Sequence, residues 1–180
     1  LDAAVKFCKS IESFNIAALE EPLKHATPEL LAKLQSQTSI PIMSDEALLT
    51  LDDAEVLIQK KSVRMFNIRL AKCGGLGSCI KLVQKAEQAG IKLQLGALVG
   101  ETALLSSVGR TFAAAFSSFL FVEGSYGTLL LKDDISKQSV RFGHGGRAPL
   151  LRGLGLQVDV DESVVMKYAR KDLVQELSFS

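Results

Sequence analysis

The sequence predicts an α/β protein, and more narrowly part of a (β/α) TIM-type barrel. Short apolar segments alternate with helical patterns of about ten to fifteen residues, which is typical of parallel strands joined by helical crossovers. Charged residues also stand at or near the carboxyl ends of successive predicted strands. In a barrel all of these ends surround one mouth, where active sites collect. A doubly wound sheet would instead concentrate function at one switch point, so the charged strand ends favour the barrel.

Five short apolar segments are predicted to form the strands. Each is rich in branched or other apolar side chains and is bounded by charged residues, glycine or proline, as buried parallel strands are. In chain order, these predicted strands lie in residues 15–23, 40–48, 63–72, 91–100 and 118–125. Their spacing leaves room for one helix between each pair of strands.

A helix is predicted before the first strand and after each of the first four strands. In residues 1–14 the apolar side chains recur three and four positions apart, as on one face of a helix. Thr27 and Thr50 stand where threonine N-caps begin helices, and Pro28 suits a first turn. Gly90 is typical of a helix end. The predicted helices occupy residues 1–14, a segment starting at residue 27, and residues 50–61, 78–90 and 102–116.

The last part of the chain has a different pattern. From about Arg141 the alternation is replaced by glycine-rich sequence, with a final helix predicted near 162–176. We therefore expect residues 1–140 to form a partial barrel, and residues 141–180 to form loops and a helix that pack on the barrel or on a further domain. The chain begins with Leu1 rather than methionine, and we expect it to start inside a longer protein.

Composition excludes several classes of partner. The 21 basic and 20 acidic residues nearly cancel, so no basic stripe predicts binding to nucleic acid or to a membrane surface. The most apolar stretch, residues 112–122, is shorter than the roughly 20 residues that a bilayer span needs. Cys8, Cys73 and Cys79 form no C-x-x-C pair and are expected to be free thiols. These features predict a cytoplasmic protein.

The segment "NIRLAKCGGLGSC", residues 67–79, joins a predicted strand to a predicted helix through three glycines. Glycines in this place could belong to a dinucleotide-binding turn. Their G-G-x-G spacing lacks the later glycine, however, and Gln94 and Leu95 stand about 20 residues on, where an acid should bind ribose. A strand-to-helix turn that needs positive φ angles is therefore the favoured interpretation.

Two carboxylates at the ends of neighbouring predicted strands form the sharpest candidate site. Glu20 and Asp45 are 25 residues apart, which is one strand-helix unit, so their side chains would converge at the mouth of a barrel. Carboxylate oxygens suit a hard divalent ion such as Mg²⁺. Acids at strand ends also serve as helix caps or solvated rim charges, and spacing alone favours that simpler interpretation.

Four segments together resemble the second half of an enolase-superfamily barrel, in the right order and at the right spacing. They are "LEEPL", "IPIMSDEAL", "FNIRLAKCGGLG" and "LGALVGETALLSS". The resemblance extends to about residue 160 and is nearest to the muconate-lactonizing enzyme subgroup, which includes muconate cycloisomerases, dipeptide epimerases and o-succinylbenzoate synthases. It implies a capping domain followed by a modified (β/α) barrel, of which this chain would contain strands four to eight.

The resemblance also implies a reaction and roles for individual residues. Such enzymes abstract a proton α to a carboxylate while Mg²⁺ stabilises the enediolate. Glu20 and Asp45 would be metal ligands, and Glu46 a carboxylate that orients the ligands or a base. Glu101 would line the catalytic site, although a charge at a helix start is an equally good interpretation. The third metal ligand and a pair of lysines are expected upstream of Leu1.

Arg69 departs from the subgroup, because it stands 24 residues after Asp45 where a second catalytic lysine is expected. Arginine is a poor general base, since its pKa is above about 12. We therefore expect Arg69 to hold a substrate carboxylate or to stabilise negative charge, which favours one-base chemistry over two-base racemisation. Strand alternation points Asn67 and Arg69 the same way, which makes Asn67 a candidate for substrate binding, and directs Lys72 elsewhere.

A second departure lies on the last predicted strand. Dipeptide epimerases carry an Asp-x-Asp there that binds the substrate ammonium, whereas this chain has Gly124 and Tyr126 at those places. Tyr126 is therefore a candidate substrate-binding residue. The ammonium group of a dipeptide substrate would therefore have no carboxylate to bind it at these two positions.

These observations predict a Mg²⁺-dependent lyase or isomerase that acts on a small carboxylate substrate, in the manner of a muconate cycloisomerase, an o-succinylbenzoate synthase or an epimerase. The expected partners are the capping domain and strands one to three of the same protein, in a homo-oligomer. This chain alone is expected to be inactive, with an unpaired sheet edge. Two alternatives remain open. One is a divergent member that binds a carboxylate without turnover, and the other is a Schiff-base barrel aldolase that uses Lys72.

Overall fold

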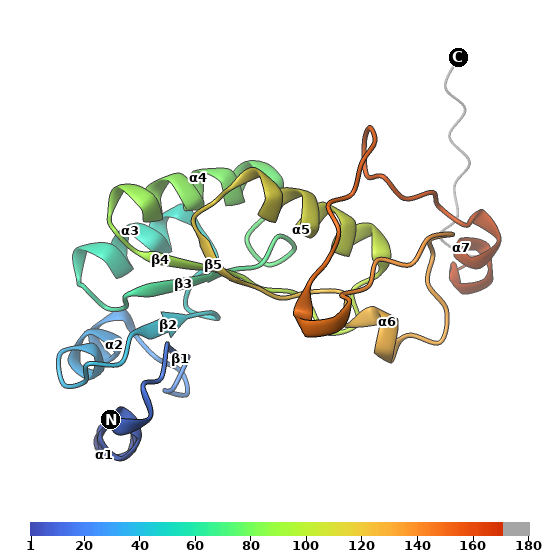
Figure 1. The fold of residues 1–180 in the computed structure, drawn as a ribbon. Coiled ribbons are helices and arrows are strands. Elements are labelled where there is room, and N and C mark those ends of the chain that lie inside the picture. Colours follow the sequence, from blue (N-terminus) through green and yellow to red (C-terminus); the bar gives the residue numbers. More distant parts are fainter. Residues whose placement is uncertain (171–180) are drawn as a thin grey trace. The chain divides into compact units, whose positions relative to one another are not determined.

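A five-stranded parallel sheet organises the described part of the chain. The computed structural model describes residues 1–170, so the end of the helix predicted near 162–176 lies outside the described residues. In order across the sheet, the strands are β1 (Leu19–Glu20), β2 (Ile42–Ser44), β3 (Met65–Ile68), β4 (Lys92–Leu95) and β5 (Phe119–Val122). Each strand pairs in parallel with the next strand along the chain (Figure 1).

Helices connect the strands in the predicted alternation. The α-helices are α1 (Asp2–Ile11), α2 (Pro28–Gln35), α3 (Leu51–Gln59), α4 (Leu76–Gln88), α5 (Ala103–Ala115), α6 (Gly127–Leu130) and α7 (Glu162–Tyr168), with 3-10 turns η1 at Glu12–Phe14 and η2 at His144–Gly146. One of the first five helices precedes β1, and one follows each of β1 to β4. The alternation predicted from the sequence is therefore confirmed.

The strand order separates the two α/β architectures considered for the sequence. A doubly wound sheet reverses its order at a switch point, whereas a barrel adds each new strand beside the previous one. The five strands here follow one another without reversal, from β1 to β5. This is the arrangement of a barrel segment, and the predicted fold class is confirmed.

The helix ends agree with the predicted caps. Thr27 Oγ1 accepts a hydrogen bond from the Leu30 N–H at 3.3 Å, with Pro28 as the first residue of α2. Thr50 and Asp53 form a reciprocal capping box at the start of α3. After α4, Gly90 adopts a φ of 69°, a conformation that glycine reaches without steric cost. These helix ends were therefore predictable from residues within one turn of each end.

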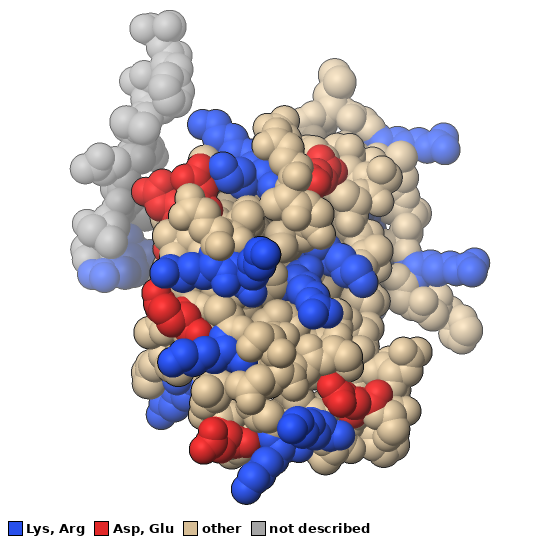
Figure 2. Space-filling view, turned by 90° about the vertical axis from the view of Figure 1, so that its left-hand side faces the viewer, with Lys and Arg blue, Asp and Glu red and all other residues tan. Residues whose placement is uncertain are grey.

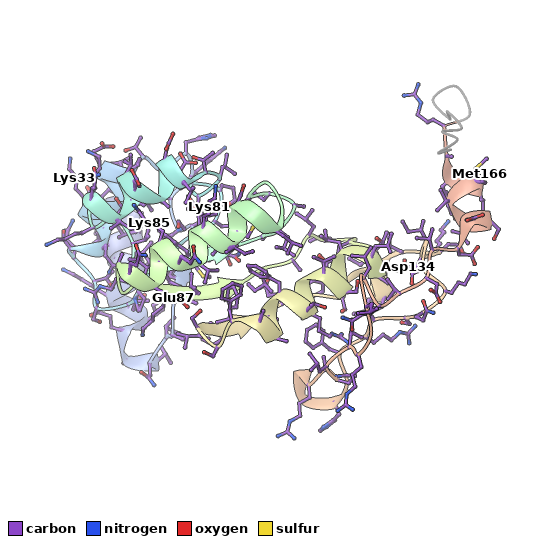
Figure 3. The ribbon with its side chains drawn as sticks, turned by 90° about the horizontal axis from the view of Figure 1, so that it is seen from above. Lys33, Lys81, Lys85, Glu87, Asp134 and Met166 are labelled. Carbon is purple, nitrogen blue, oxygen red and sulfur yellow. The ribbon has the colours of Figure 1, made fainter. Side chains whose placement is uncertain are left out.

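The core lies between the sheet and its helices. Every residue of β2 and β3 is buried, as expected of parallel strands covered on both faces. Helices α3 and α4 pack against each other along one side of the sheet, and α4 also contacts β3 and β4 (Figure 1). Lys81, Lys85 and Glu87 lie along α4 (Figure 3), and Lys85 pairs with Glu55 of α3 at 2.6 Å.

The chain divides into two compact units. The first contains Leu1–Gly96 and Ala115–Glu123, and therefore all five strands. The second contains Ala97–Ala114 and the chain from Gly124 onward. The predicted boundary near residue 140 lies inside the second unit. The packing partner proposed for residues 141–180 stays a prediction.

The charged surface, the helices and the cysteines can be compared with what the composition predicted. Basic and acidic side chains are mixed on the face shown in Figure 2. Among residues 1–170, no helix has the length and apolar character required to cross a bilayer. Cys8, Cys73 and Cys79 are free and buried, as predicted for unpaired thiols.

Candidate active site

The carboxyl ends of three adjacent strands bring five of the predicted site residues together in the first unit. Glu20 ends β1, Asp45 and Glu46 follow β2, and Asn67 and Arg69 lie at the end of β3. The Nδ2 atom of Asn67 donates to Glu20 Oε1 at 2.7 Å, so this bond reaches from β3 to β1 across the middle strand. The convergence expected of a barrel mouth is present between these strands.

Asp45 is the centre of this cluster, because two cations hold its carboxylate. Arg69 Nη2 donates to Asp45 Oδ2, and Lys72 Nζ donates to Asp45 Oδ1 at 2.6 Å. Lys72 also donates to the main-chain oxygens of Asp45 and Asn67. The three side chains are largely buried, with exposed fractions of 8% for Asp45, 19% for Arg69 and 11% for Lys72. This is a charged triad removed from bulk water.

The triad changes the acidity of its members. Burial acts to raise the pKa of Asp45, but the hydrogen bonds and charges of Lys72 and Arg69 outweigh burial and leave that pKa below its usual value. Burial acts to lower the pKa of Arg69, and the adjacent carboxylates of Asp45 and Glu46 reverse this effect and raise it. Asp45 is therefore an anion and Arg69 a cation, and Arg69 in this setting cannot act as a general base.

The position of Lys72 corrects a sequence-based inference. Strand alternation was expected to direct Lys72 away from Arg69, yet both side chains bind Asp45. The physical reason is that β3 ends at Ile68, and residues 70–74 form a turn in which the two-residue period of a strand no longer applies. Gly74, at the end of this turn, and Gly75 after it were the signal in the sequence that the strand stops before Lys72.

Glu46 occupies the outer part of the cluster. Its Oε1 accepts a hydrogen bond from Arg69 Nη2 at 3.1 Å, and its side chain is 68% exposed. Arg69 thus bridges a buried carboxylate and an exposed one. Glu46 therefore helps to raise the pKa of Arg69. Its predicted catalytic role stays a prediction.

Two buried polar atoms in the cluster have no hydrogen-bond partner among the described residues. They are Asn67 Oδ1 and Arg69 Nε. Buried polar groups are usually paired, and an unpaired one at a strand-end cluster is a place where a ligand could bind. The donor on Arg69 suits an anionic ligand oxygen, and the acceptor on Asn67 suits a hydroxyl or an amide.

The carboxylates fit a magnesium ion in kind but supply only part of its coordination. Glu20 and Asp45 offer hard oxygen atoms from neighbouring strand ends, and Mg²⁺ is commonly bound by one or two carboxylates together with water or substrate oxygens. Within residues 1–170 no three His, Cys, Asp or Glu side chains gather closely enough to hold a metal. A complete site would therefore need ligands beyond these two.

The remaining predicted site residues, Glu101 and Tyr126, lie in the second unit. Glu101 accepts hydrogen bonds from Ser106 Oγ at 2.6 Å, from the Ser125 N–H at 3.2 Å and from the Leu98 N–H at 3.3 Å. These bonds give Glu101 a role in holding the local loops. Tyr126 is exposed and precedes α6. The functional roles of both residues stay predictions.

Gly96, directly after β4, is expected to be required for the geometry of Asn67 and Arg69. A Cβ atom at Gly96 would overlap Asn67 Oδ1 and lie 2.8 Å from Arg69 Cγ. The Gly96→Ala variant should therefore displace both side chains and destabilise the protein by about 1 to 3 kcal/mol, as overpacking does. Urea unfolding measures this change.

Gly77→Ala is the matched control for this prediction. Gly77 lies in α4, and a Cβ atom there would have no neighbour within 4 Å. Alanine also favours the helix, so this variant should be at least as stable as the wild type. Equal stability of the Gly96→Ala and Gly77→Ala variants would contradict the close packing at Gly96.

Comparison with known proteins assigns this chain to a family. Residues 1–164 match the family model described as "Enolase C-terminal domain-like". The chain is 32% identical to an N-succinyl-L-Arg/Lys racemase of Bacillus cereus, over 85% of this chain and 41% of the relative. It is 29% identical to muconate cycloisomerase 1 of Pseudomonas putida, over 93% of this chain and 44% of the relative. The chain thus spans less than half of the length of these two relatives.

Solved structures agree with the sequence comparisons. The Bacillus cereus N-succinyl Arg/Lys racemase superposes with a TM-score of 0.82 at 28% identity, covering 91% of this chain and 43% of that protein. A Cytophaga hutchinsonii dipeptide epimerase, solved with Mg and the dipeptide D-Ala-L-Val, shares the fold with a TM-score of 0.84 at 24% identity, covering 92% of this chain and 45% of that protein. This chain therefore belongs to the enolase C-terminal domain-like family, with racemases, epimerases and muconate cycloisomerases among its relatives.

Proposed function

We propose that the complete protein containing this chain is a Mg²⁺-dependent isomerase or lyase that removes a proton α to the carboxylate of a small substrate. Family membership supports an isomerase-type enzyme, because the relatives are named as racemases, epimerases and cycloisomerases. The residue-level observation that carries the proposal is the buried Asp45 carboxylate, which Arg69 binds and which follows the middle one of three strands, with Glu20 at the end of one neighbour and Arg69 at the end of the other.

In this proposal Glu20 and Asp45 hold the metal, and the ion supplies positive charge beside the substrate carboxylate when it is bound. Lys72 keeps the Asp45 side chain in place through its bond to Oδ1 and its bond to the Asp45 main-chain oxygen. Asn67 does the same for Glu20. The two ligand side chains are thus pre-oriented by neighbours, which reduces the ordering cost of binding.

Arg69 supplies substrate binding and charge stabilisation in the proposed reaction. Its Nη2 is engaged by Asp45 and Glu46, whereas its buried Nε has no partner among the described residues and could donate to a substrate oxygen. A permanently charged guanidinium stabilises a developing negative charge but does not accept the α-proton at neutral pH. Proton removal would therefore be assigned to a single base outside residues 1–170.

This proposal predicts proton exchange on one face of the substrate. The complete protein with Mg²⁺ in D₂O, tested on a panel of carboxylates, is expected to incorporate deuterium at the α-carbon of its substrate without racemising it. Mass spectrometry and chiral chromatography measure the two outcomes. Binding of a carboxylate with no deuterium incorporation would instead support the family member without turnover.

The aldolase alternative receives no support from the structure of the site. A Schiff-base lysine must be neutral to attack a carbonyl. Lys72 is instead ion-paired with Asp45 at 2.6 Å and donates to two main-chain oxygens. Family membership also points to a different chemistry. Trapping of a carbonyl substrate on Lys72 by borohydride would reverse this conclusion.

A further inference from the structure

We infer that Glu21 is a positioning residue, which orients Asp45 by holding the main chain that follows β2. This inference rests on the proposed role of Asp45 as a metal ligand and adds a residue to it. Glu21 follows the other proposed ligand, Glu20, directly in the chain. One residue would thus link the two ligand-bearing strand ends.

The geometry around Glu21 joins β1 to the end of β2 in two ways. Its main-chain N–H donates to the Met43 oxygen at 2.9 Å, which continues the ladder between the strands. Its side-chain Oε2 then accepts the N–H of Asp45 at 2.8 Å. The main chain of Ala47 also acts to lower the pKa of this carboxylate. The Glu21 side chain therefore holds the main chain directly after β2, at Asp45.

The environment of Glu21 indicates a constrained position. Its φ of 35° is uncommon for a residue other than glycine, and such a conformation persists where surrounding contacts hold it. Burial raises the pKa of the Glu21 carboxyl, and the hydrogen bonds from Asp45 and Ala47 only partly offset this effect. Glu21 and Glu46 also line one cavity of about 410 Å³. The constrained segment therefore borders space that a ligand could enter.

Loss of the Glu21 carboxylate would release the Asp45 main chain. Asp45 is only 6% exposed, so its freed N–H would have little access to water and the segment would shift to find another acceptor. The Asp45 carboxylate would then move relative to Glu20. Residues that orient metal ligands typically contribute roughly 10-fold to 100-fold in metal affinity.

The experiment compares Glu21→Ala, Glu21→Gln and a matched control in the complete protein. Glu12→Ala is the control, because Glu12 Oε1 accepts the Ser39 N–H at 3.0 Å before the amino end of β2, whereas Glu21 acts after its carboxyl end. Hydrogen exchange of the Asp45 amide, followed by mass spectrometry in the absence of metal, measures whether Glu21 holds the Asp45 main chain. Calorimetric titration with Mg²⁺ measures whether loss of this contact weakens metal binding.

The expected result is that Glu21→Ala loses protection of the Asp45 amide and binds Mg²⁺ at least about 10-fold more weakly, while Glu12→Ala does neither. Glu21→Gln keeps one acceptor oxygen and should recover part of both properties. The inference is overturned if the Asp45 amide stays protected in Glu21→Ala, or if Mg²⁺ affinity falls no further than in Glu12→Ala. A wild type that binds no Mg²⁺ would refute the proposed function, and amide exchange would then decide the positioning by itself.

Discussion

Replacing Asp45 with asparagine is expected to destabilise the protein by about 3 to 5 kcal/mol, because the change leaves two largely buried cations without their common partner. Arg69 and Lys72 both bind the Asp45 carboxylate, and their side chains are only 19% and 11% exposed. Urea unfolding at neutral pH measures the loss. The variant should also lose Mg²⁺ binding if the proposed function is correct.

The pair between Lys85 and Glu55 provides the control. Its N–O distance is 2.6 Å, the same as between Lys72 and Asp45, but its side chains are 36% and 48% exposed. Solvent screens such a pair, so Glu55→Gln should cost less than about 1 kcal/mol. Equal costs for Asp45→Asn and Glu55→Gln would contradict the conclusion that burial makes the Asp45 triad important for stability.

The contribution of Asp45 should also depend on pH with a definite sign. Burial acts to raise the pKa of Asp45, but Lys72 and Arg69 lower it below the usual 3.8. A carboxylate whose folded-state pKa is depressed stabilises the fold above its unfolded pKa, and this contribution disappears as the pH falls through the folded value. The difference in unfolding free energy between wild type and Asp45→Asn should therefore shrink below about pH 4. If the difference in unfolding free energy between the two proteins stayed constant from neutral pH to pH 2, the ionised Asp45 carboxylate would not be the source of the stability.

Replacing Arg69 with lysine is expected to change the stereochemical outcome of the proposed reaction. Lysine can titrate in a buried site, and a general base typically contributes roughly 10²-fold to 10⁴-fold. The complete protein carrying Arg69→Lys should therefore racemise its substrate at least about 100-fold faster than the wild type. It should also bind the substrate carboxylate more weakly, since the planar guanidinium fork is lost.

Arg69→Gln separates these two effects. Glutamine removes the charge without adding a base, so this variant should bind the carboxylate weakly and show no racemisation. Chiral chromatography after incubation in D₂O measures each variant. Rapid racemisation by the wild type would show that Arg69 is no obstacle to two-base chemistry, and the proposed one-base reaction would be wrong.

Much of the fold followed from local patterns in the sequence. The alternation of apolar strands and amphipathic helices predicted a parallel barrel segment, and the sequential order β1 to β5 confirms it. The caps at Thr27 and Thr50 were predictable because a threonine N-cap depends on residues within one turn of the helix. The observed strands are shorter than the predicted segments, because a strand ends where its pairing with the neighbouring strands ends, and the sequence pattern does not show that point.

The sequence by itself determined which strand ends carry the charged residues, because that depends only on spacing along the chain. Only the tertiary structure decided how these charges pair. Lys72 reaches Asp45 because a turn replaces the strand after Ile68, and Glu21 binds the Asp45 N–H because β1 and β2 lie side by side. Both contacts join residues more than 20 positions apart, and their geometry depends on three-dimensional packing that no local pattern encodes. Arg69, which stands where the resemblance implies a lysine, is one of the two cations that bind the buried Asp45 carboxylate.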